Sequence, residues 1–166
     1  CTNINYVKID RKNKEHVKII GEINDFMEKL FPDKSLRYYM WDHLASILIG
    51  HNDNQTFHFY LGVGSNGKSL FVELLEKVLG DYKGTAPLTM ITGSRTREGQ
   101  ATPEIVSLKG KRYAVLQEAK KNTVLNEGTF KEYTGCDSIT GRPLYGAKMV
   151  TFKPMFNMIL CTNYLP

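Results

Sequence analysis

The chain has 166 residues, a balanced composition and a formal net charge of +5. This length predicts one domain, or one domain with a short appendage, that buries about two-thirds of its unfolded surface. No apolar run approaches the roughly 20 residues of a membrane span, and no secretory signal begins the chain, so we expect no membrane association.

The cysteines and the first residue bear on compartment and completeness. Three cysteines, scattered along the chain, predict neither a disulfide framework nor a zinc cluster. We therefore expect a soluble protein of a reducing, intracellular compartment. Because the chain does not begin with Met, we expect it to be a piece of a longer protein. The positive charge permits a polyanionic partner.

The first 50 residues predict a leader followed by helices. Residues 1–14 are polar and lysine-rich, which is typical of a leader or linker. Over 15–30 the apolar residues recur at a helical period, and Phe31-Pro32 ends the pattern. A second helix is expected over 36–49.

The second helix carries its own boundary signals. Ser35 is expected to cap its first turn, and Gly50 supplies the stop. His43 falls near the apolar face, and we interpret it as a packing residue rather than a chemical group. Residues 15–50 therefore predict a small helical segment in front of a core over 51–166.

The core opens with a strand, a glycine-rich loop and a helix. Residues 56–61 are β-prone, residues 62–69 follow the pattern G-x-x-x-x-G-K-S, and residues 70–80 have a helical pattern. This context predicts a phosphate-binding loop, in which glycines let backbone N–H groups approach phosphate oxygens at a helix N-terminus. The expected nucleotide-binding residues are Gly62, Gly64, Ser65, Asn66, Gly67, Lys68 and Ser69.

Two side chains of this loop carry specific expectations. Lys68 is expected to reach the β- and γ-phosphates of ATP, and the Ser69 hydroxyl to ligate Mg²⁺. The alternative is a glycine-rich turn with an incidental lysine.

The stretch after the phosphate-loop helix is less regular. Residues 80–84 predict a turn, and residues 85–101 have no clear period. Within them, 93–100 is polar and basic, and is either a solvated surface loop or a contact with nucleic acid or a neighbouring subunit. Residues 102–104, Thr-Pro-Glu, predict the start of a short helix that ends near Leu108.

The remaining sequence predicts strands around one helix. A buried strand is expected over 113–117, and Asn126 is expected to cap a helix that runs to Thr134. Residues 138–144 and 149–152 predict a hairpin, and 156–161 a last apolar strand.

Polar side chains directly follow two of these strands. Glu118 follows 113–117, where it would hold Mg²⁺ and orient or deprotonate the attacking water. Asn163 follows the last strand and would bond the γ-phosphate or that water. In a parallel sheet these positions share one edge with the phosphate loop. The alternatives are an ordinary strand-end glutamate and a turn asparagine.

Together these motifs resemble the superfamily 3 helicases, a branch of the AAA+ ATPases, and especially the primase–helicases of large DNA viruses and phages. The resemblance covers 15–166 and rests on the phosphate loop, on 116–118 as motif B, on 134–145 as motif B′ and on 156–166 as motif C. It implies a three-layer α/β P-loop NTPase of AAA+ type with a parallel central sheet, preceded by a small helical segment.

The resemblance also implies a function. The chain would be the ATP-dependent motor of a DNA helicase, which hydrolyses ATP at the subunit interfaces of a homo-hexamer and translocates on single-stranded DNA. Lys68, Glu118 and Asn163 would be catalytic, and Ser69 and Glu118 would hold Mg²⁺. Whether a primase domain lies upstream is left open, and a viral protein would work in the host cytoplasm or nucleus.

The hairpin would contact DNA in this family. The hairpin between Leu144 and Val150 is similar to the family's pre-sensor hairpin, so Lys148 and Tyr145 would contact the DNA strand, mostly at phosphates. Arg142 also fits the motif and is a candidate for nucleic-acid contact, while structural ion pairing is equally open for it. The role of Lys131 is left open.

The sequence departs from the family pattern and leaves two rivals. Gln117 stands before Glu118 where some members carry a second acid, and the family's arginine finger would lie beyond Pro166. One rival is a small-molecule phosphotransferase, in which Arg95 and Arg97 would form a lid. The other is a non-enzymatic, nucleotide-dependent module for nucleic-acid binding or assembly.

Overall fold

The helical segment forms largely as the apolar period predicts. The computed structural model describes residues 2, 4–64, 66–93, 100–117 and 119–166. Helix α1 spans Lys14–Leu30 and helix α2 spans Lys34–Ile49. The prediction that Ser35 caps α2 is wrong, because the Asp33 carboxylate accepts a bond from the Leu36 N–H at 2.7 Å. A carboxylate at this position also complements the positive end of the helix dipole.

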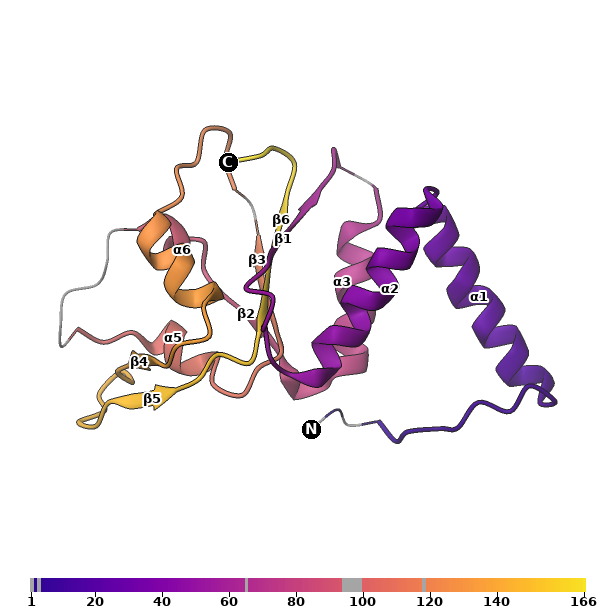
Figure 1. Cartoon of the computed structure of the whole chain (residues 1–166), viewed down its shortest axis with the longest axis horizontal. Helices are drawn as coiled ribbons and strands as arrows, with labels where there is room; N and C mark the ends of the chain where they lie inside the picture. Colours follow the sequence, from indigo (N-terminus) through magenta and orange to yellow (C-terminus); the bar gives the residue numbers. More distant parts are fainter. Residues whose placement is uncertain (1, 3, 65, 94–99, 118) are drawn as a thin grey trace.

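Four parallel strands form the central sheet (Figure 1). They are β1 (Phe57–Leu61), β2 (Lys83–Thr85), β3 (Tyr113–Gln117) and β6 (Asn157–Thr162), in the order β1-β6-β3-β2. Leu61 lies opposite Thr162, and Gln117 lies opposite Cys161. The carboxyl ends of β1, β6 and β3 therefore share one edge of the sheet.

The other elements agree with the sequence in part. They are α3 (Lys68–Leu79), the 3-10 turn η1 (Gly80–Tyr82), α4 (Thr89–Thr92), α5 (Pro103–Ser107), α6 (Glu127–Thr134) and the antiparallel strands β4 (Ile139–Gly141) and β5 (Val150–Phe152). The expected turn over 80–84 contains the start of β2, and the stretch 85–101 contains α4. Strand β2 is short and contains glycine; it is a strand because it pairs with β3, which overrides its local preference.

Both faces of the sheet are covered (Figure 1). Tyr113 and Val115 pack with α3 and with buried residues of α1 and α2, whereas Ala114 and Leu116 pack with α4, α5, α6 and the hairpin. A parallel strand buried on both faces has an almost continuous apolar sequence, as residues 113–116 and 158–160 do. The fold is therefore α/β, with helices on both sides of a parallel sheet.

Two histidines join α2 to β1. His43 is only 5% exposed, as its predicted packing role requires, and its Nε2 lies 2.9 Å from the Tyr60 hydroxyl. His58 Nε2 lies 2.9 Å from the Tyr39 hydroxyl. The two imidazoles stack with their centroids 3.8 Å apart. Burial, and then the proximity of His58, lowers the pKa of His43 to about 4, and burial also lowers the pKa of His58.

We expect acid to destabilise this chain through the histidine pair. His43 binds a proton near pH 6.5 in the unfolded chain but only near pH 4 in the folded chain. The contribution of neutral His43 to the free energy of unfolding is therefore complete above about pH 6.5 and is lost as the pH falls toward 4. The loss reaches about 2.5 kcal/mol at about pH 4.5. Urea unfolding of the wild type and of His43→Gln, above about pH 6.5 and at about pH 4.5, measures this loss. The variant should lose less stability on acidification than the wild type. An equal loss in both chains would contradict this prediction. The control is His16→Gln, in the first turn of α1 and outside the stacked histidine pair.

Candidate functional site

The glycine-rich loop joins β1 to α3 at the carboxyl edge of the sheet. Its start is fixed because the Gly62 N–H donates to the Thr162 carbonyl at 3.2 Å. A Cβ on Gly62 would overlap the side-chain amide of Asn66. Gly67 has φ +81, and a Cβ there would also lie 2.9 Å from Leu30 Cδ1. Gly67 is therefore required by its backbone conformation, whereas a Cβ on Gly62 would have to displace only the ends of flexible side chains, and Gly64 has open space around it.

Lys68 is held over the loop by oxygen atoms from both ends of the site. Its ammonium donates to the Gly62 carbonyl, to Asn66 Oδ1 at 3.0 Å and to Asn163 Oδ1 at 3.3 Å. Asn163 reaches Lys68 because β6 is the direct neighbour of β1. The structure thus brings together four sequence-predicted residues, and it also exposes the Ser69 side chain beside them.

The first turn of α3 has features that suit an anion. Asn13, Asp33 and Asn126 cap α1, α2 and α6 through their side chains. Helix α3 instead begins at Gly67, with no side-chain cap and no acidic residue in its first turn. Its first N–H groups and the positive end of its dipole therefore face the loop without a carboxylate.

A cavity of about 540 Å³ lies next to Lys68. On α3 its wall includes Glu73 and Glu76, which pair with Lys77 and Lys83 at 3.1 Å each. The wall also contains Lys68, Lys120 and Lys121, and no carboxylate in the described part of the chain pairs with them. The cavity is therefore basic. The lining residues are Lys68, Ser69, Val72, Glu73, Glu76, Lys83, Gln117, Ala119, Lys120, Lys121, Cys161, Thr162, Asn163 and Tyr164.

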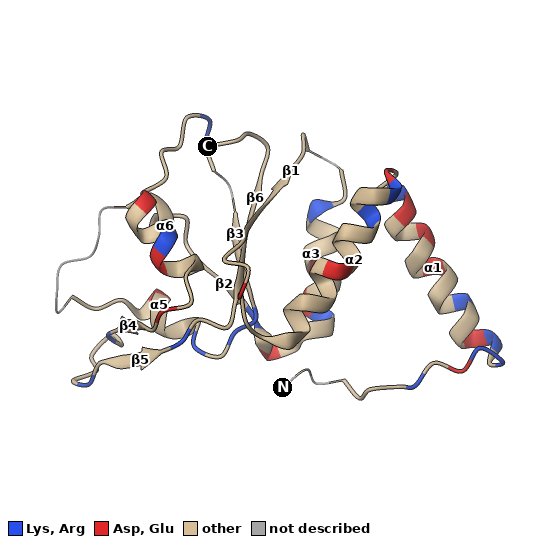
Figure 2. Cartoon of the chain, in the orientation of Figure 1, with Lys and Arg blue, Asp and Glu red and all other residues tan. Residues whose placement is uncertain are grey.

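Lys120 and Lys121 were missed by the sequence reasoning. They lie on the loop after β3, where Figure 2 marks basic residues. The only signal was their place, two and three residues past the expected Glu118. Cys161 also lines the cavity, and burial raises the pKa of its thiol despite the opposing effect of Lys68. It therefore stays protonated at neutral pH and is not a nucleophile there.

Two predicted site residues, Ser65 and Glu118, lie outside the described residues. The neighbours of Glu118, Gln117 and Ala119, both line the cavity. Within the described ranges, no three His, Cys, Asp or Glu side chains cluster as a metal site. Of the expected Mg²⁺ ligands, the structure therefore describes Ser69 alone, and its hydroxyl is a hard oxygen donor of the kind Mg²⁺ prefers.

The predicted nucleic-acid residues lie far from Lys68. The β4–β5 hairpin is at the opposite end of the sheet from the glycine-rich loop (Figure 1). Tyr145, 98% exposed, and the exposed Lys148 lie in the turn between its strands. Arg142 is half-buried, and its Nε donates to the Gly146 carbonyl at 3.1 Å, so this side chain shapes the turn.

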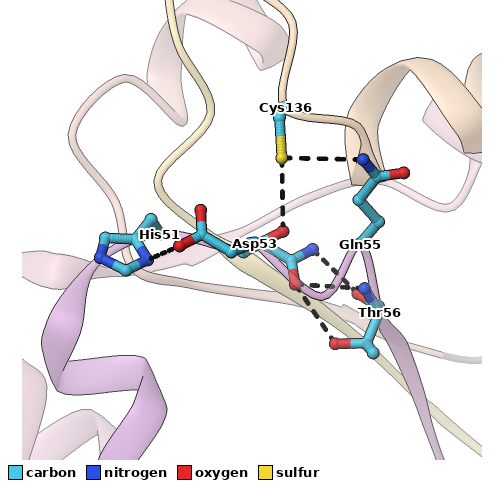
Figure 3. A network of polar contacts seen from close by, with 6 residues as sticks. His51, Asp53, Gln55, Thr56 and Cys136 are labelled. Atoms are coloured by element: carbon cyan, nitrogen blue, oxygen red, sulfur yellow. Dashed lines mark hydrogen bonds and ion pairs between the residues drawn. The ribbon is translucent and has the colours of Figure 1, made fainter.

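A polar network anchors the segment that precedes the hairpin (Figure 3). The buried Asn52 donates to the carbonyls of Thr56 at 3.0 Å and Thr134 at 3.4 Å. The Cys136 thiol donates to the Asn52 carbonyl at 3.7 Å and accepts from Gln55 at 3.8 Å. The loop before β1 is therefore tied to the end of α6 and to the start of the expected motif B′.

Comparisons with known proteins give related viral sequences. The chain is 38% identical over 166 residues to "Putative helicase L207/L206" of Acanthamoeba polyphaga mimivirus, and 36% identical over 144 residues to "Putative helicase 022R" of Frog virus 3. These two matches include 100% and 85% of the chain, respectively. A protein named as a putative primase of African swine fever virus (strain Badajoz 1971 Vero-adapted) is 26% identical over 98% of the chain and 16% of that protein. The chain spans only 17% and 15% of the length of the first two relatives.

Solved structures share the fold. The apo structure of the NrS-1 C terminal region (305-718) matches with a TM-score of 0.66 over 98% of this chain and 36% of that one, at 15% identity. The A form apo structure of this region matches with a TM-score of 0.68 over 99% and 36%, at 16% identity.

Two further findings concern membrane spans and the protein family. No helix among the described residues is long and apolar enough to cross a membrane. Residues 60–166, from the end of β1 to the last residue, match a family described as a family of unknown function, DUF5906. That match includes the glycine-rich loop, Lys68 and Asn163, and the chain belongs to the DUF5906 family.

Proposed function

We propose that this chain is the ATP-hydrolysing core of a superfamily 3 helicase, with an AAA+ type P-loop fold. The observation that carries the proposal is the contact of Lys68 Nζ with Asn163 Oδ1 at 3.3 Å, beside the uncapped start of α3 and a basic cavity. A loop lysine, a strand-end amide and free helix N–H groups are the groups that hold and sense a terminal phosphate. The viral relatives named as helicases and primases support a role in replication.

The residues would divide the work as follows. The Lys68 ammonium exchanges its internal bonds for the β- and γ-phosphates of ATP, while the α3 N–H groups hold the β-phosphate. Release from Lys68 would free Asn163 to donate from Nδ2 to the γ-phosphate or to accept from the attacking water at Oδ1. Glu118 orients that water and accepts its proton. Mg²⁺, held by Ser69 and Glu118, would neutralise charge as it develops on the phosphates.

Strand β6 offers a route from hydrolysis to movement. It ends at Asn163, and its first residues follow the β5 strand of the hairpin by a short link over 153–156. Phe152, just before the link, and Phe156, its last residue, are both buried in the core. A shift of Asn163 on loss of the γ-phosphate would therefore be transmitted along β6 to the hairpin, where Lys148 and Tyr145 would hold single-stranded DNA.

The assembled enzyme would have subunits around the DNA. In the homo-hexamer of our proposal, a neighbour supplies an arginine to the basic cavity, and the hairpins line the channel. A primase domain upstream would couple unwinding to primer synthesis. These features belong to the longer protein, because the chain spans 17% of its mimivirus relative.

We expect Glu118→Gln to abolish turnover without abolishing binding. The test is ATP hydrolysis by the longer protein, with and without single-stranded DNA. Hydrolysis should be stimulated by the DNA, and Glu118→Gln should lower it roughly 10²- to 10⁴-fold while ATP still binds, because an amide cannot accept the proton. Glu127→Gln is the matched control, since Glu127 is exposed and pairs with Lys131 on α6 at 3.5 Å.

Each failure of this test has a distinct meaning. Full turnover in Glu118→Gln would show that Glu118 is not the group that accepts the proton from the attacking water. A rate of ATP hydrolysis that single-stranded DNA does not change would contradict the proposed helicase activity and favour a small-molecule phosphotransferase. Nucleotide binding with no turnover in the wild-type protein would favour a binding or assembly module.

A further inference from the structure

The segment that follows β3 brings two lysines to the basic cavity. Lys120 and Lys121 line it together with Lys68. Both are exposed, and neither ammonium has an ion pair or a hydrogen bond with another described residue. Because no described partner holds these two charges, both are available to a ligand in the cavity.

The backbone that carries the two lysines is fixed beside the end of β6. The Thr162 hydroxyl, on the last residue of β6, donates to the Ala119 carbonyl at 3.4 Å. The N–H and the hydroxyl of Thr123 donate to the Lys120 carbonyl at 3.1 and 2.7 Å. Asn122 has φ +65, a left-handed conformation that asparagine tolerates in tight turns. The turn over 119–123 is therefore closed and anchored to the end of β6.

The position of this turn relates the lysines to a terminal phosphate. The glycine-rich loop follows β1, Asn163 follows β6, and the turn follows β3, and these strands are neighbours in that order. A phosphate chain that starts on the first N–H groups of α3 and extends toward Asn163 therefore runs toward the turn. Its last phosphate is the group that the long side chains of Lys120 and Lys121 would reach.

The charges of the cavity favour a long phosphate chain. Lys68 and the N–H groups of α3 are sufficient to hold two phosphates. The carboxylates of the wall do not cancel the added lysines, because Glu73 and Glu76 pair with Lys77 and Lys83. Two further ammonium groups stabilise a third phosphate through charge-assisted bonds.

We propose that Lys120 and Lys121 bind the terminal phosphate of the nucleotide held by their own chain, so that the site selects a nucleoside triphosphate over the diphosphate. This role depends on the ATP site proposed above for the glycine-rich loop. A diphosphate lacks the third phosphate and therefore gains nothing from the two lysines. The selection is built into one subunit and does not require a neighbour.

The test is calorimetric titration of the chain with a non-hydrolysable ATP analogue and with ADP, each with Mg²⁺. Lys120→Met and Lys121→Met keep a similar stem without the charge, so each should weaken binding of the analogue roughly three- to tenfold, and the double variant roughly thirtyfold. The affinity for ADP should change less than about threefold. Lys109→Met is the control, because Lys109 is exposed in the turn before β3 and carries the same charge at the other end of the strand.

A wild-type measurement gives the same answer if a variant fails to fold. Tripolyphosphate should displace the ATP analogue more strongly than pyrophosphate does, because only the longer chain reaches the turn. Equal displacement by the two would overturn the proposed selection.

The outcomes separate this role from the ATP site itself. A wild type that binds neither nucleotide, or binding that survives Lys68→Ala, overturns the ATP site and this role with it. If binding depends on Lys68 but the double variant keeps its preference for the analogue over ADP, only the role of Lys120 and Lys121 is overturned. Equal losses for the analogue and ADP, or the same loss in Lys109→Met, would show an effect of net charge and would also overturn it. A preference that appears only when the chain oligomerises would assign the terminal phosphate to a neighbouring subunit instead.

Discussion

Replacing Lys68 with alanine is expected to weaken the binding of ATP by roughly two orders of magnitude. The ammonium makes charge-assisted bonds, each worth about 1.5–3 kcal/mol, and the proposed nucleotide takes at least one at each of two phosphates. Its present partners are a backbone carbonyl and two side-chain amide oxygens, so its loss leaves no buried charge unpaired. Fluorescence titration with a labelled ATP analogue and Mg²⁺ measures the change.

The same helix offers the matched control. Lys77→Ala removes an exposed lysine that pairs with Glu73 at 3.1 Å, and it should leave the affinity unchanged. Equal losses of ATP affinity in the two variants would mean that the loss reflects the net charge of the protein rather than a specific contact of Lys68. An unchanged affinity in Lys68→Ala would mean that the glycine-rich loop does not hold the phosphates.

Replacing Phe71 with alanine is expected to cost about 3–5 kcal/mol of unfolding free energy. Phe71 is 1% exposed and follows the loop by one turn of α3. Its ring contacts Phe31 edge-on at 5.5 Å and Tyr60 at 5.7 Å. It therefore joins the link between α1 and α2, the strand β1 and the helix that follows the loop.

Urea unfolding measures this cost directly. Leu70→Ala is the control, because Leu70 is the preceding residue of the same helix and is exposed, so it should change stability by less than about 0.5 kcal/mol. Phe71→Leu should retain much of the stability lost in Phe71→Ala. Similar losses for Leu70→Ala and Phe71→Ala would contradict the assigned packing.

Local sequence signals predicted the elements whose residues decide their own structure. The apolar period of 15–30 and the buried run 113–117 gave α1 and β3, and Asn126 caps α6 as expected, with its side chain accepting from Gly128 and Thr129. Strand β2 was missed, because a Lys-Gly-Thr segment becomes a strand only by pairing with β3. The cap of α2 was misassigned because Asp33 and Ser35 are both good N-cap residues, and the helix begins at Lys34, directly after Asp33.

The site was predictable where it depends on strand ends. A glycine-rich loop after one parallel strand and Asn163 after another must share an edge, and the pairing of β1 with β6 brings Lys68 to Asn163. Lys120 and Lys121 were not predictable, because a loop's path over a cavity follows from tertiary packing. The hollow lined by Tyr39, His58 and Asn157 was also not predictable, since these residues come together only in the fold.

The distance between the hairpin and Lys68 bears on the proposed motor. Within one chain the two are at opposite ends of the sheet, so nucleotide and DNA would not touch the same residues (Figure 1). Their connection would be mechanical, through β6, or would run through a neighbouring subunit. Because Arg142 Nε is bonded to the Gly146 carbonyl within the turn, this side chain holds the shape of the hairpin, and its contact with DNA stays a prediction.

A crystal structure of the chain with a non-hydrolysable ATP analogue and Mg²⁺ tests the central proposal most directly. We predict that the β- and γ-phosphates lie against Lys68 Nζ and the first N–H groups of α3, with Mg²⁺ on the Ser69 hydroxyl and Asn163 within hydrogen-bond reach of the γ-phosphate. Phosphates bound elsewhere, with Lys68 still bonded to Gly62 and Asn163, would contradict it.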